Sequence, residues 1–361
     1  MPKSQGRALD RKKLLADPIL VAAIIGIFLF LFLFILYPLA ILLTDSVVVE
    51  KNINGTTLKT IGFANFIKIF KMTNFRHAIS NTLWLGLISG IGSTVIGFLF
   101  AYVDSYVDVG SKIVKKLFGV VSILPVVSPP FVLSLSAILL FGRTGVITRG
   151  LFNMNNTQLY GWRGIALVQI LTFFPVCYMM LKGLLKNIDP SLEEAARNMG
   201  ASRFKVFQTV TFPLLLPGIG NAFLVSFIES VADFANPMII GGNFDTLATS
   251  IYLQLTGAYD KSGATAMAVV LLVISMGLFI LEKYWLERKS VATLTGKATR
   301  GRSAITDSSV RIPLVTICTL LTVFVISMYI LVPFGSLFKI WGRDYHLSLK
   351  WYEYIFKNKG Y

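Results

Sequence analysis

Charged residues are scarce in this sequence. Asp, Glu, Lys and Arg make up only 14% of its 361 residues, whereas 55% of the residues are hydrophobic. The mean hydropathy of +0.70 lies well outside the range of ordinary soluble domains. This composition argues against a soluble enzyme or binding module. It predicts a protein that crosses a membrane several times.

Cysteine and histidine are almost absent, with two residues of each. Cys177 and Cys318 fall inside hydrophobic runs, where core packing is expected rather than a disulfide or a metal pair. His77 and His346 stand alone, without the spacing of metal ligands. No catalytic set of side chains is recognisable, and the single Gly-Lys pair lacks the glycine spacing of a phosphate loop. We therefore expect no metal site, no cofactor and no enzymatic activity.

Long hydrophobic runs are abundant instead. A hydrocarbon core of about 30 Å requires about 20 helical residues, and seven runs qualify. They are residues 20–43, 82–104, 117–141, 165–184, 214–240, 264–286 and 313–337. The first follows a basic leader but has no small-residue cleavage site, so we expect it to be retained as a span. The sequence predicts an all-α membrane protein with about seven transmembrane helices.

The net charge of +16 is interpreted through its distribution along the chain. With a cytoplasmic N-terminus, 20 of the 34 Lys and Arg residues lie inside and 14 outside, and the opposite topology reverses this bias. We therefore predict a multi-pass membrane protein with its N-terminus in the cytoplasm. The lipid bilayer, and not nucleic acid, is the expected partner of the basic residues.

A charged and polar segment, residues 189–218, separates the fourth run from the fifth and is predicted to be cytoplasmic. Either Asp189 caps a helix that has Pro190 at its first position, or Ser191 caps it together with a glutamate three residues later. Gly200 suits the left-handed end of this helix. About ten helical residues span about 15 Å, half of what a bilayer crossing needs, so the helix is expected to lie outside the membrane.

A second short helix is expected to begin after Ser202 and to end at Pro213. Each helix has an apolar face, formed in the first by Leu192, Ala195, Ala196 and Met199 and in the second by Phe204, Val206, Phe207 and Val210. In a cytoplasmic loop, such faces are covered by the membrane ends of the same protein or by a partner with a groove.

The spacing of small and charged residues in this segment resembles a known motif. The pattern is Glu-Ala-Ala, three residues, Gly, nine residues, Ile, one residue, Leu-Pro, the EAA motif of binding-protein-dependent ABC importer permeases. Residues that match it outright are Glu194, Ala195, Ala196, Gly200 and Pro213, while Val210 and Phe212 replace Ile and Leu. The resemblance implies a protein of the bacterial inner membrane with the type I importer permease fold, whose cytoplasmic coupling helices dock into a cleft on a separate ATPase. A helical loop that only joins two spans is the alternative.

The coupling set that the resemblance implies is Glu193, Glu194, Ala195, Ala196, Gly200, Val210 and Pro213. Two further segments, residues 229–260 and 293–302, resemble the subgroup of these permeases associated with ferric iron, and closely similar ones for aminoethylphosphonate. The resemblance covers about residues 20–302. It implies a permease for ferric iron delivered by an external binding protein, with aminoethylphosphonate or another small anion as the alternative cargo.

The sequence also contains an internal resemblance. The stretch FILYPLAILL, from Phe34, resembles YILVPFGSLF, from Tyr329, and NFIKIFKMTNF, from Asn65, resembles WYEYIFKNKGY, from Trp351. We predict a basic leader (1–18), a six-helix permease half (19–286) with its coupling loop (189–213), a basic linker (287–311), and the start of an incomplete second repeat (312–361). A chance resemblance is the alternative. A second permease half is expected from another copy of the chain or from another polypeptide.

The fifth run carries polar residues at Glu229, Asp233 and Asn236, a spacing that places them on one face of a helix. A carboxylate at mid-bilayer costs about 2.5 to 3.5 kcal/mol even on the lenient insertion scale, so this face should look into protein or water. We predict that the three residues line the translocation path; a position near the outer boundary is the alternative. The same carboxylates would suit an ion-coupled secondary transporter. A membrane scaffold that does not transport anything is a further alternative hypothesis for the function of the chain.

Two runs contain residues that modify helix geometry. Prolines 125, 129 and 130 interrupt the third run, which indicates either a gating helix or a fixed kink. Glycines 86, 90, 92 and 97 in the second run are spaced for close packing between helices.

Overall fold

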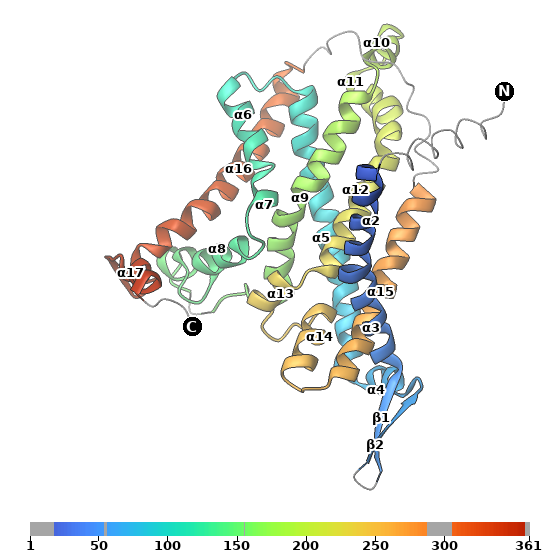
Figure 1. Cartoon of the computed structure of the whole chain (residues 1–361). Helices are drawn as coiled ribbons and strands as arrows, with labels where there is room; N and C mark the ends of the chain where they lie inside the picture. The colour runs from blue at the N-terminus through green and yellow to red at the C-terminus, as the bar shows by residue number, and fades with distance from the viewer. Residues whose placement is uncertain (1–17, 54–55, 155, 287–304, 358–361) are drawn as a thin grey trace, which may run out of the picture. The chain divides into compact units, whose positions relative to one another are not determined.

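The computed structural model describes residues 18–53, 56–154, 156–286 and 305–357 (Figure 1). Within these ranges, seven helices are long and apolar enough to cross a membrane, which confirms the predicted number. They are Pro18–Val47, Thr73–Tyr106, Val132–Leu151, Trp162–Asn187, Arg203–Ala232, Lys261–Tyr284 and Ser308–Ser336. Most of the predicted basic leader and linker, including residues 293–302, lies outside the described residues.

The chain divides into two compact units, which are described separately. The first comprises Met1–Met72 with Ile251–Val270, and the second comprises Thr73–Ser250 with Leu271–Tyr361. Helices α14 (Leu247–Thr256) and α15 (Lys261–Leu281) run from one unit into the other.

The first span belongs to the first unit and is built from α2 (Pro18–Leu31), a π-helical turn (Phe32–Leu36) and α3 (Tyr37–Val47). Strands β1 (Val48–Ile53) and β2 (Thr56–Ile61) follow as an antiparallel hairpin, and helix α4 (Ala64–Lys71) comes next. The Asn65 side chain donates hydrogen bonds to the carbonyl oxygens of Ser46 at 3.1 Å and Val48 at 2.9 Å. These bonds fix α4 against the base of the hairpin.

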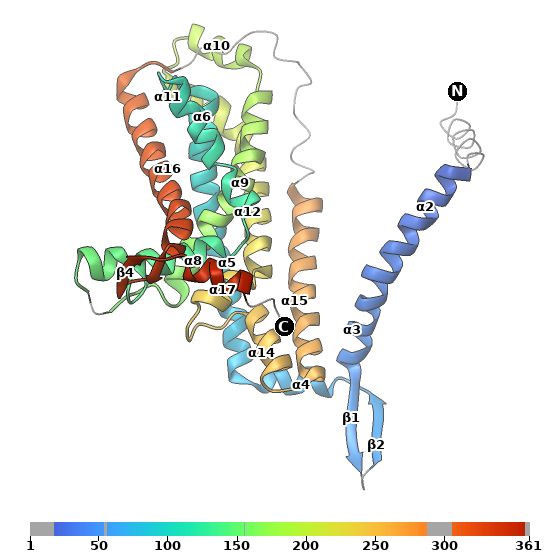
Figure 2. The same ribbon diagram turned by 60° about the vertical axis from the view of Figure 1, so that its left-hand side comes forward.

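The second unit is centred on three helices, α5 (Thr73–Tyr106), α9 (Trp162–Asn187) and α12 (Phe212–Ala232), which pack against one another (Figure 2). The glycines of α5 lie at these contacts. A Cβ on Gly86 would stand 3.2 Å from the Phe227 ring of α12, and one on Gly97 would stand 2.6 Å from the Cys177 Cβ of α9. The absence of side chains at these positions therefore allows the helices to approach closely.

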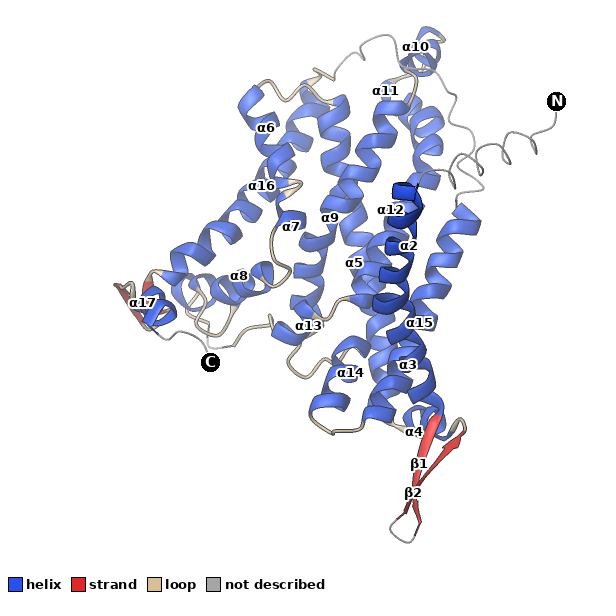
Figure 3. Cartoon of the chain, in the orientation of Figure 1, coloured by secondary structure: helices blue, strands red, loops and turns tan. Residues whose placement is uncertain are grey.

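The third hydrophobic run was predicted to span the membrane over residues 117–141 with an interruption at its prolines; the interruption is present, but the predicted bounds of the span are wrong. The chain forms α6 (Lys112–Val121), α7 (Leu124–Val127) and α8 (Val132–Phe141), with non-helical backbone between α7 and α8 (Figure 3). Ser128 is extended, at φ −81° and ψ 153°, because the residue before a proline is disfavoured in helical geometry. The candidate span begins after this break, at Val132, and continues through a π-helical turn (Val146–Leu151).

The seventh span, α16 (Ser308–Ser336), packs against α6 and α8 of the same unit. Ser136 of α8 donates a hydrogen bond to the carbonyl oxygen of Met328 at 2.7 Å, and the hydroxyl groups of Ser128 and Tyr329 lie 2.6 Å apart. The remaining described elements of this unit are α10 (Pro190–Asn198), α11 (Arg203–Val206), α13 (Ala235–Ile240), two π-helical turns (Phe207–Thr211 and Glu282–Leu286), β3 (Phe338–Ile340), β4 (Asp344–Leu347) and α17 (Lys350–Lys357).

The predicted internal repeat has a counterpart in the order of elements. The first span is followed by an antiparallel hairpin and the short helix α4, and α16 is likewise followed by the hairpin β3–β4 and the short helix α17. The assignment of residues 312–361 to a second permease repeat stays a prediction.

Candidate functional site in the loop between the fourth and fifth spans

Helix α10 begins and ends as its sequence predicts. Of the two possible caps the chain uses Asp189, whose carboxylate accepts a hydrogen bond from the backbone N–H of Ser191 at 2.9 Å, with Pro190 at the first helical position. Hydrogen bonds from Ser191 hold the pKa of the Asp189 carboxyl below its usual value. Gly200 closes the helix with a φ of +87°, a conformation that residues with a Cβ rarely adopt.

The second predicted loop helix is not a separate element. Ser202 caps α11 by accepting a hydrogen bond from the backbone N–H of Lys205 at 3.3 Å, and the helix continues through the π-helical turn Phe207–Thr211 into α12. Pro213 does not end it, because the helix changes to π-helical geometry directly before this residue, and such a turn is a common way for a helix to accommodate a carbonyl that a proline leaves unbonded. The predicted end at Pro213 is therefore wrong, and α11 is the extension of the fifth span.

Helix α10 has an inner and an outer face. Pro190, Glu193 and Ala196, spaced three residues apart, point into the protein, and Ala196 is only 8% exposed. Ala195 and Met199 lie on the outer side, and Met199 is 83% exposed. The prediction that Ala195, Ala196 and Met199 share one apolar face is therefore wrong for Ala196, which packs toward the bundle.

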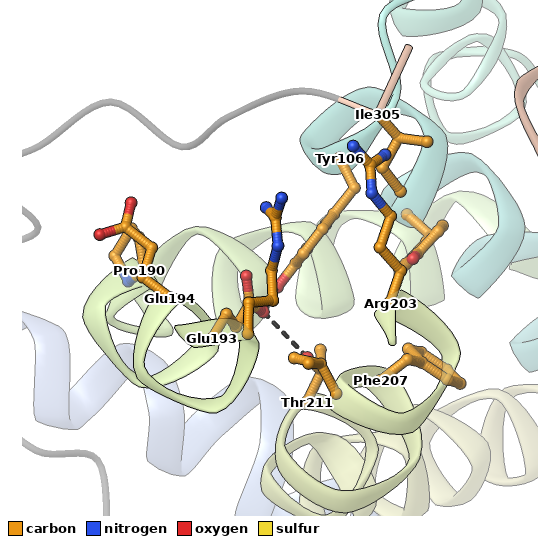
Figure 4. A pocket seen from close by; sticks show the side chains of 11 residues that line it. Tyr106, Pro190, Glu193, Glu194, Arg203, Phe207, Thr211 and Ile305 are labelled. Carbon is orange, nitrogen blue, oxygen red and sulfur yellow. Dashed lines mark hydrogen bonds between the residues drawn. The ribbon is translucent and has the colours of Figure 1, made fainter. Parts of the chain in front are cut away.

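The Glu193 carboxylate joins α10 to two other elements. Its Oε1 atom accepts a hydrogen bond from the Tyr106 hydroxyl of α5 at 2.6 Å and one from the Thr211 hydroxyl at 2.8 Å. Figure 4 marks the bond to Thr211 with a dashed line. Both donors are buried, Tyr106 at 6% exposure and Thr211 at 2%. Sequence reasoning missed Tyr106 and Thr211 because only the folded chain brings them to Glu193.

A small cavity of about 70 Å³ opens beside this carboxylate (Figure 4). Its lining residues are Tyr102, Tyr106, Pro190, Glu193, Glu194, Arg197, Arg203, Val206, Phe207, Thr211 and Ile305. Ile305 belongs to the segment that leads into α16, and its N–H donates a hydrogen bond to the Tyr106 carbonyl oxygen at 2.7 Å. The base of α10 thus meets residues of α5, the start of α12 and the approach to α16.

The other predicted coupling residues differ in exposure. Glu194 and Gly200 are exposed, and a Cβ at Gly200 would meet no atom within 4 Å. Val210 is half-buried and Pro213 is exposed. Nearby, Lys182 of α9 forms an ion pair with Asp104 of α5 at 2.8 Å. The C-terminal ends of these two spans are therefore also joined by opposite charges.

The predicted polar face of the fifth span is interrupted by a break in the helix. Helix α12 ends at Ala232, Asp233 has extended backbone geometry, and α13 begins at Ala235. Glu229, Asp233 and Asn236 therefore do not lie on one continuous helix. The Asp233 carboxylate accepts a hydrogen bond from the Asn236 side-chain amide at 2.9 Å, which closes the break.

Asp233 and Asn236 belong to a buried hydrogen-bond network across several helices. The Gln169 amide of α9 donates to Asp233 at 2.8 Å, and its oxygen accepts from Ser89 of α5 at 2.8 Å and from Ser230 at 2.7 Å. Ser134 of α8 donates to the Asn236 amide oxygen at 2.6 Å. Since bonds of this kind satisfy buried polar groups within the bundle, the network holds α5, α8, α9 and the broken fifth span together.

Glu229 lies outside this network. Its Oε2 atom is buried and has no hydrogen-bond partner among the described residues. In the same described part of the chain, no three His, Cys, Asp or Glu side chains gather into a group that could hold a metal ion.

Comparisons with known proteins place this geometry in a family. Residues 93–291 match the family described as "Binding-protein-dependent transport system inner membrane component". The chain is 35% identical over 350 residues to the ferric transport system permease protein FbpB of Actinobacillus pleuropneumoniae, covering 96% of this chain and 49% of that protein. It is 32% identical over 181 residues to the molybdenum transport system permease protein ModB of Escherichia coli K12, covering 49% of this chain and 79% of that protein.

A likeness in fold extends to a solved structure. One chain in the crystal structure of a bacterial alginate ABC transporter, in complex with an alginate pentasaccharide-bound periplasmic protein, superposes with a TM-score of 0.65 at 19% identity. The match covers 78% of this chain and 98% of that chain. The chain spans about half the length of the ferric permease relatives that it matches. Since the family match extends over more than half of its residues, the chain belongs to the inner membrane components of binding-protein-dependent transport systems, and it is a membrane component of transport rather than an enzyme.

Proposed function

We propose that this chain is a permease of an ABC importer. A separate cytoplasmic ATPase drives it, an external binding protein delivers its substrate, and a second permease half completes the path. The observation that carries this proposal is the outer face of α10, where no described residue covers Glu194 or Met199, within a loop that has the EAA spacing. The N-terminus lies in the cytoplasm in this proposal, because the excess of basic residues then faces inward.

The outer face of α10 is the docking surface for the ATPase in this mechanism. Ala195 has only a methyl group, so another backbone can approach the helix closely, and the Glu194 carboxylate is available for basic residues of the partner. Gly200 permits the turn between α10 and α11. Because α11 continues into α12 without interruption, a displacement of the docked loop moves the fifth span directly. Val210 and Pro213 take part by lying within that continuous helix.

ATP binding and hydrolysis on the partner would shift the permease between two conformations. The partner can do so only if it binds the two conformations with different affinity. In the membrane, Glu229, Asp233 and Asn236 lie beside the path. Glu229 has a carboxylate oxygen without a hydrogen-bond partner among the described residues, and the hydrogen bond between Asp233 and Asn236 links the two sides of the helix break.

Ferric iron is the proposed cargo. The support is 35% identity over 96% of this chain to FbpB and to a putative ferric permease of Haemophilus influenzae. Carboxylate and other hard oxygen ligands suit such an ion. An importer must also release its cargo, so a row of weak contacts fits the task better than a closed metal site.

The test is uptake by the reconstituted transporter. The chain, its second permease half, the ATPase and the binding protein are placed in vesicles, and ATP-dependent uptake of radioactive iron is measured. Glu194→Ala and Gly200→Val should lower uptake strongly, whereas Glu353→Ala, at an exposed carboxylate of α17, should not. Unchanged uptake in both loop variants would refute docking through α10. Uptake of aminoethylphosphonate or molybdate instead of iron would refute the proposed cargo but support the proposed permease function.

A further inference from the structure

The inner face of α10 carries a contact that the proposed docking does not require. We propose that the Glu193 carboxylate is a positioning residue that fixes α10 to α5 and to the start of α12, so that a displacement of α10 moves both spans as one body. This inference rests on the proposed role of α10 as the docking helix. In this proposal Glu193 does not contact the ATPase. It belongs to the joint behind the docking surface, which we define as Glu193, Tyr106 and Thr211.

The geometry of the joint supports this role. A single oxygen, Oε1 of Glu193, accepts hydrogen bonds from two hydroxyl groups, that of Tyr106 at 2.6 Å and that of Thr211 at 2.8 Å. Hydrogen bonds require defined distances and angles between donor and acceptor. Both donors are buried residues, so their hydroxyl groups have few other partners to turn to. The carboxylate therefore constrains the distance between three elements at once.

The surroundings of Tyr106 extend the joint. The Tyr106 ring stacks on the Tyr102 ring, with 4.9 Å between the ring centroids and an interplanar angle of 6°. The rings of Tyr102 and Phe207 form a T-shaped pair with 5.6 Å between their centroids. Tyr102 and Tyr106 belong to α5, whereas Phe207 belongs to the π-helical turn before α12. These rings form a rigid apolar support beneath the hydrogen bonds, since aromatic pairs prefer defined relative positions.

The approach to the seventh span is attached at the same residue. The N–H of Ile305 donates to the Tyr106 carbonyl oxygen at 2.7 Å, and the N–H of Asp108 donates to the Ile305 carbonyl oxygen at 3.1 Å. Asp307 then caps α16 by accepting a hydrogen bond from the N–H of Ser309 at 3.1 Å. A movement of Tyr106 that follows Glu193 is thus passed to the start of α16 through two backbone hydrogen bonds.

The remaining inner contacts of α10 cannot replace the carboxylate. Pro190 and Ala196 are buried, but their side chains are small and offer no directional bond. Without Glu193 the helix would still lie against the bundle, because apolar burial holds it there, but its position relative to α5 would vary. We therefore expect the joint to determine how closely α5 and α12 follow a displacement of α10. It does not determine whether α10 forms.

The first experiment measures this rigidity in the full chain alone, in lipid nanodiscs. Spin labels on Ala195→Cys and Lys112→Cys, both at exposed positions, report the distance between α10 and the segment after α5. The native Cys177 and Cys318 are buried and unpaired, so labelling is directed to the introduced thiols. Glu193→Ala, and Thr211→Val combined with Tyr106→Phe, should broaden the distance distribution.

Two matched variants make this result specific. Glu194→Ala, on the outer face of the same helix, should leave the distribution as narrow as in the parent protein. Glu193→Gln keeps an acceptor oxygen at the same reach and should restore the narrow distribution that Glu193→Ala loses. An equally narrow distribution in Glu193→Ala would overturn the inference, and so would broadening by Glu194→Ala alone.

The second experiment separates the joint from docking. In the complex with the ATPase, Glu193→Ala should retain co-purification of the ATPase, while the amount of iron transported per ATP hydrolysed falls below that of the parent protein, because both hydrogen bonds of the carboxylate are lost. Glu194→Ala should instead weaken co-purification. A loss of co-purification in Glu193→Ala, without broadening in the first experiment, would refute the joint. If the parent chain binds no ATPase while the spin-label distance distributions change as expected, the proposed function is refuted and the proposed role of Glu193 is supported.

Discussion

Because α5 and α9 pack closely, we predict that one methyl group added at Gly97 lowers the stability of the folded chain. A Cβ at Gly97 would lie 2.6 Å from the Cβ of Cys177, 2.8 Å from the backbone nitrogen of Tyr178 and 2.9 Å from the carbonyl oxygen of Phe174. Ordinary contacts between non-bonded carbon atoms are about 3.5 to 4.0 Å. Because two of the three neighbours are backbone atoms, no side-chain rotation can relieve the contact.

The Gly97→Ala variant must therefore separate α5 from α9 locally by about 1 Å. Overpacking of this kind typically costs about 1 to 3 kcal/mol. Gly183→Ala is the matched control, because Gly183 also lies in one of these two helices and an added Cβ there meets nothing within 4 Å. Both variants carry the same change in helix propensity, so the difference between their free energies of unfolding reports the effect of the close contact alone.

The assay is thermal unfolding of the purified chain in detergent, followed with a thiol-reactive dye. Cys177 and Cys318 are fully buried, and Cys177 lies at the contact itself, so dye fluorescence reports the opening of this interface. The midpoint for Gly97→Ala should fall below that for Gly183→Ala by about 5 °C, the shift that corresponds to 1 to 3 kcal/mol in a domain of this size. Equal midpoints for the two variants would refute the packing argument.

Three further predictions concern polar groups. Gln169→Leu leaves buried partners without hydrogen bonds and should destabilise the chain by at least about 2 kcal/mol in the same assay, whereas the exposed control Gln208→Leu should not. Asp189→Ala removes the cap of α10 and should speed amide hydrogen exchange in residues 192–199 without changing exchange in α9. Partial burial raises the pKa of Asp260, but hydrogen bonds from Lys68, Gly263 and Gln254 outweigh it and hold the pKa below the usual 3.8. The stability from this carboxylate is therefore present above about pH 4 and lost as the pH falls through the lowered pKa, and thermal midpoints of Asp260→Asn should lose this dependence.

Much of the architecture could be predicted from local properties of the sequence. Hydropathy and length identified seven spans, because the number of helical residues that cross a bilayer depends on each segment alone. The cap at Asp189 and the left-handed turn at Gly200 were predicted because capping depends on a few neighbouring backbone groups. The break at the prolines of the third run was visible as a sequence feature, but not that it would divide the run into three helices.

The candidate site shows where such reasoning ends. The sequence placed both alanines of the motif on one docking face, whereas the fold buries Ala196 and leaves Ala195 exposed. It treated Asp233 as a residue of a continuous helix, whereas Gln169, 64 positions away in sequence, holds it at a helix break.

The sequence by itself determined that the chain crosses the membrane and that a short capped helix stands between the fourth and fifth spans, because these properties depend on residues within one segment. Only the tertiary structure decided that Glu193 faces inward to Tyr106 and Thr211, since a carboxylate takes its partners from whichever donors the fold brings within hydrogen-bonding distance. Tyr106 lies 87 positions from Glu193, and no local pattern encodes that contact.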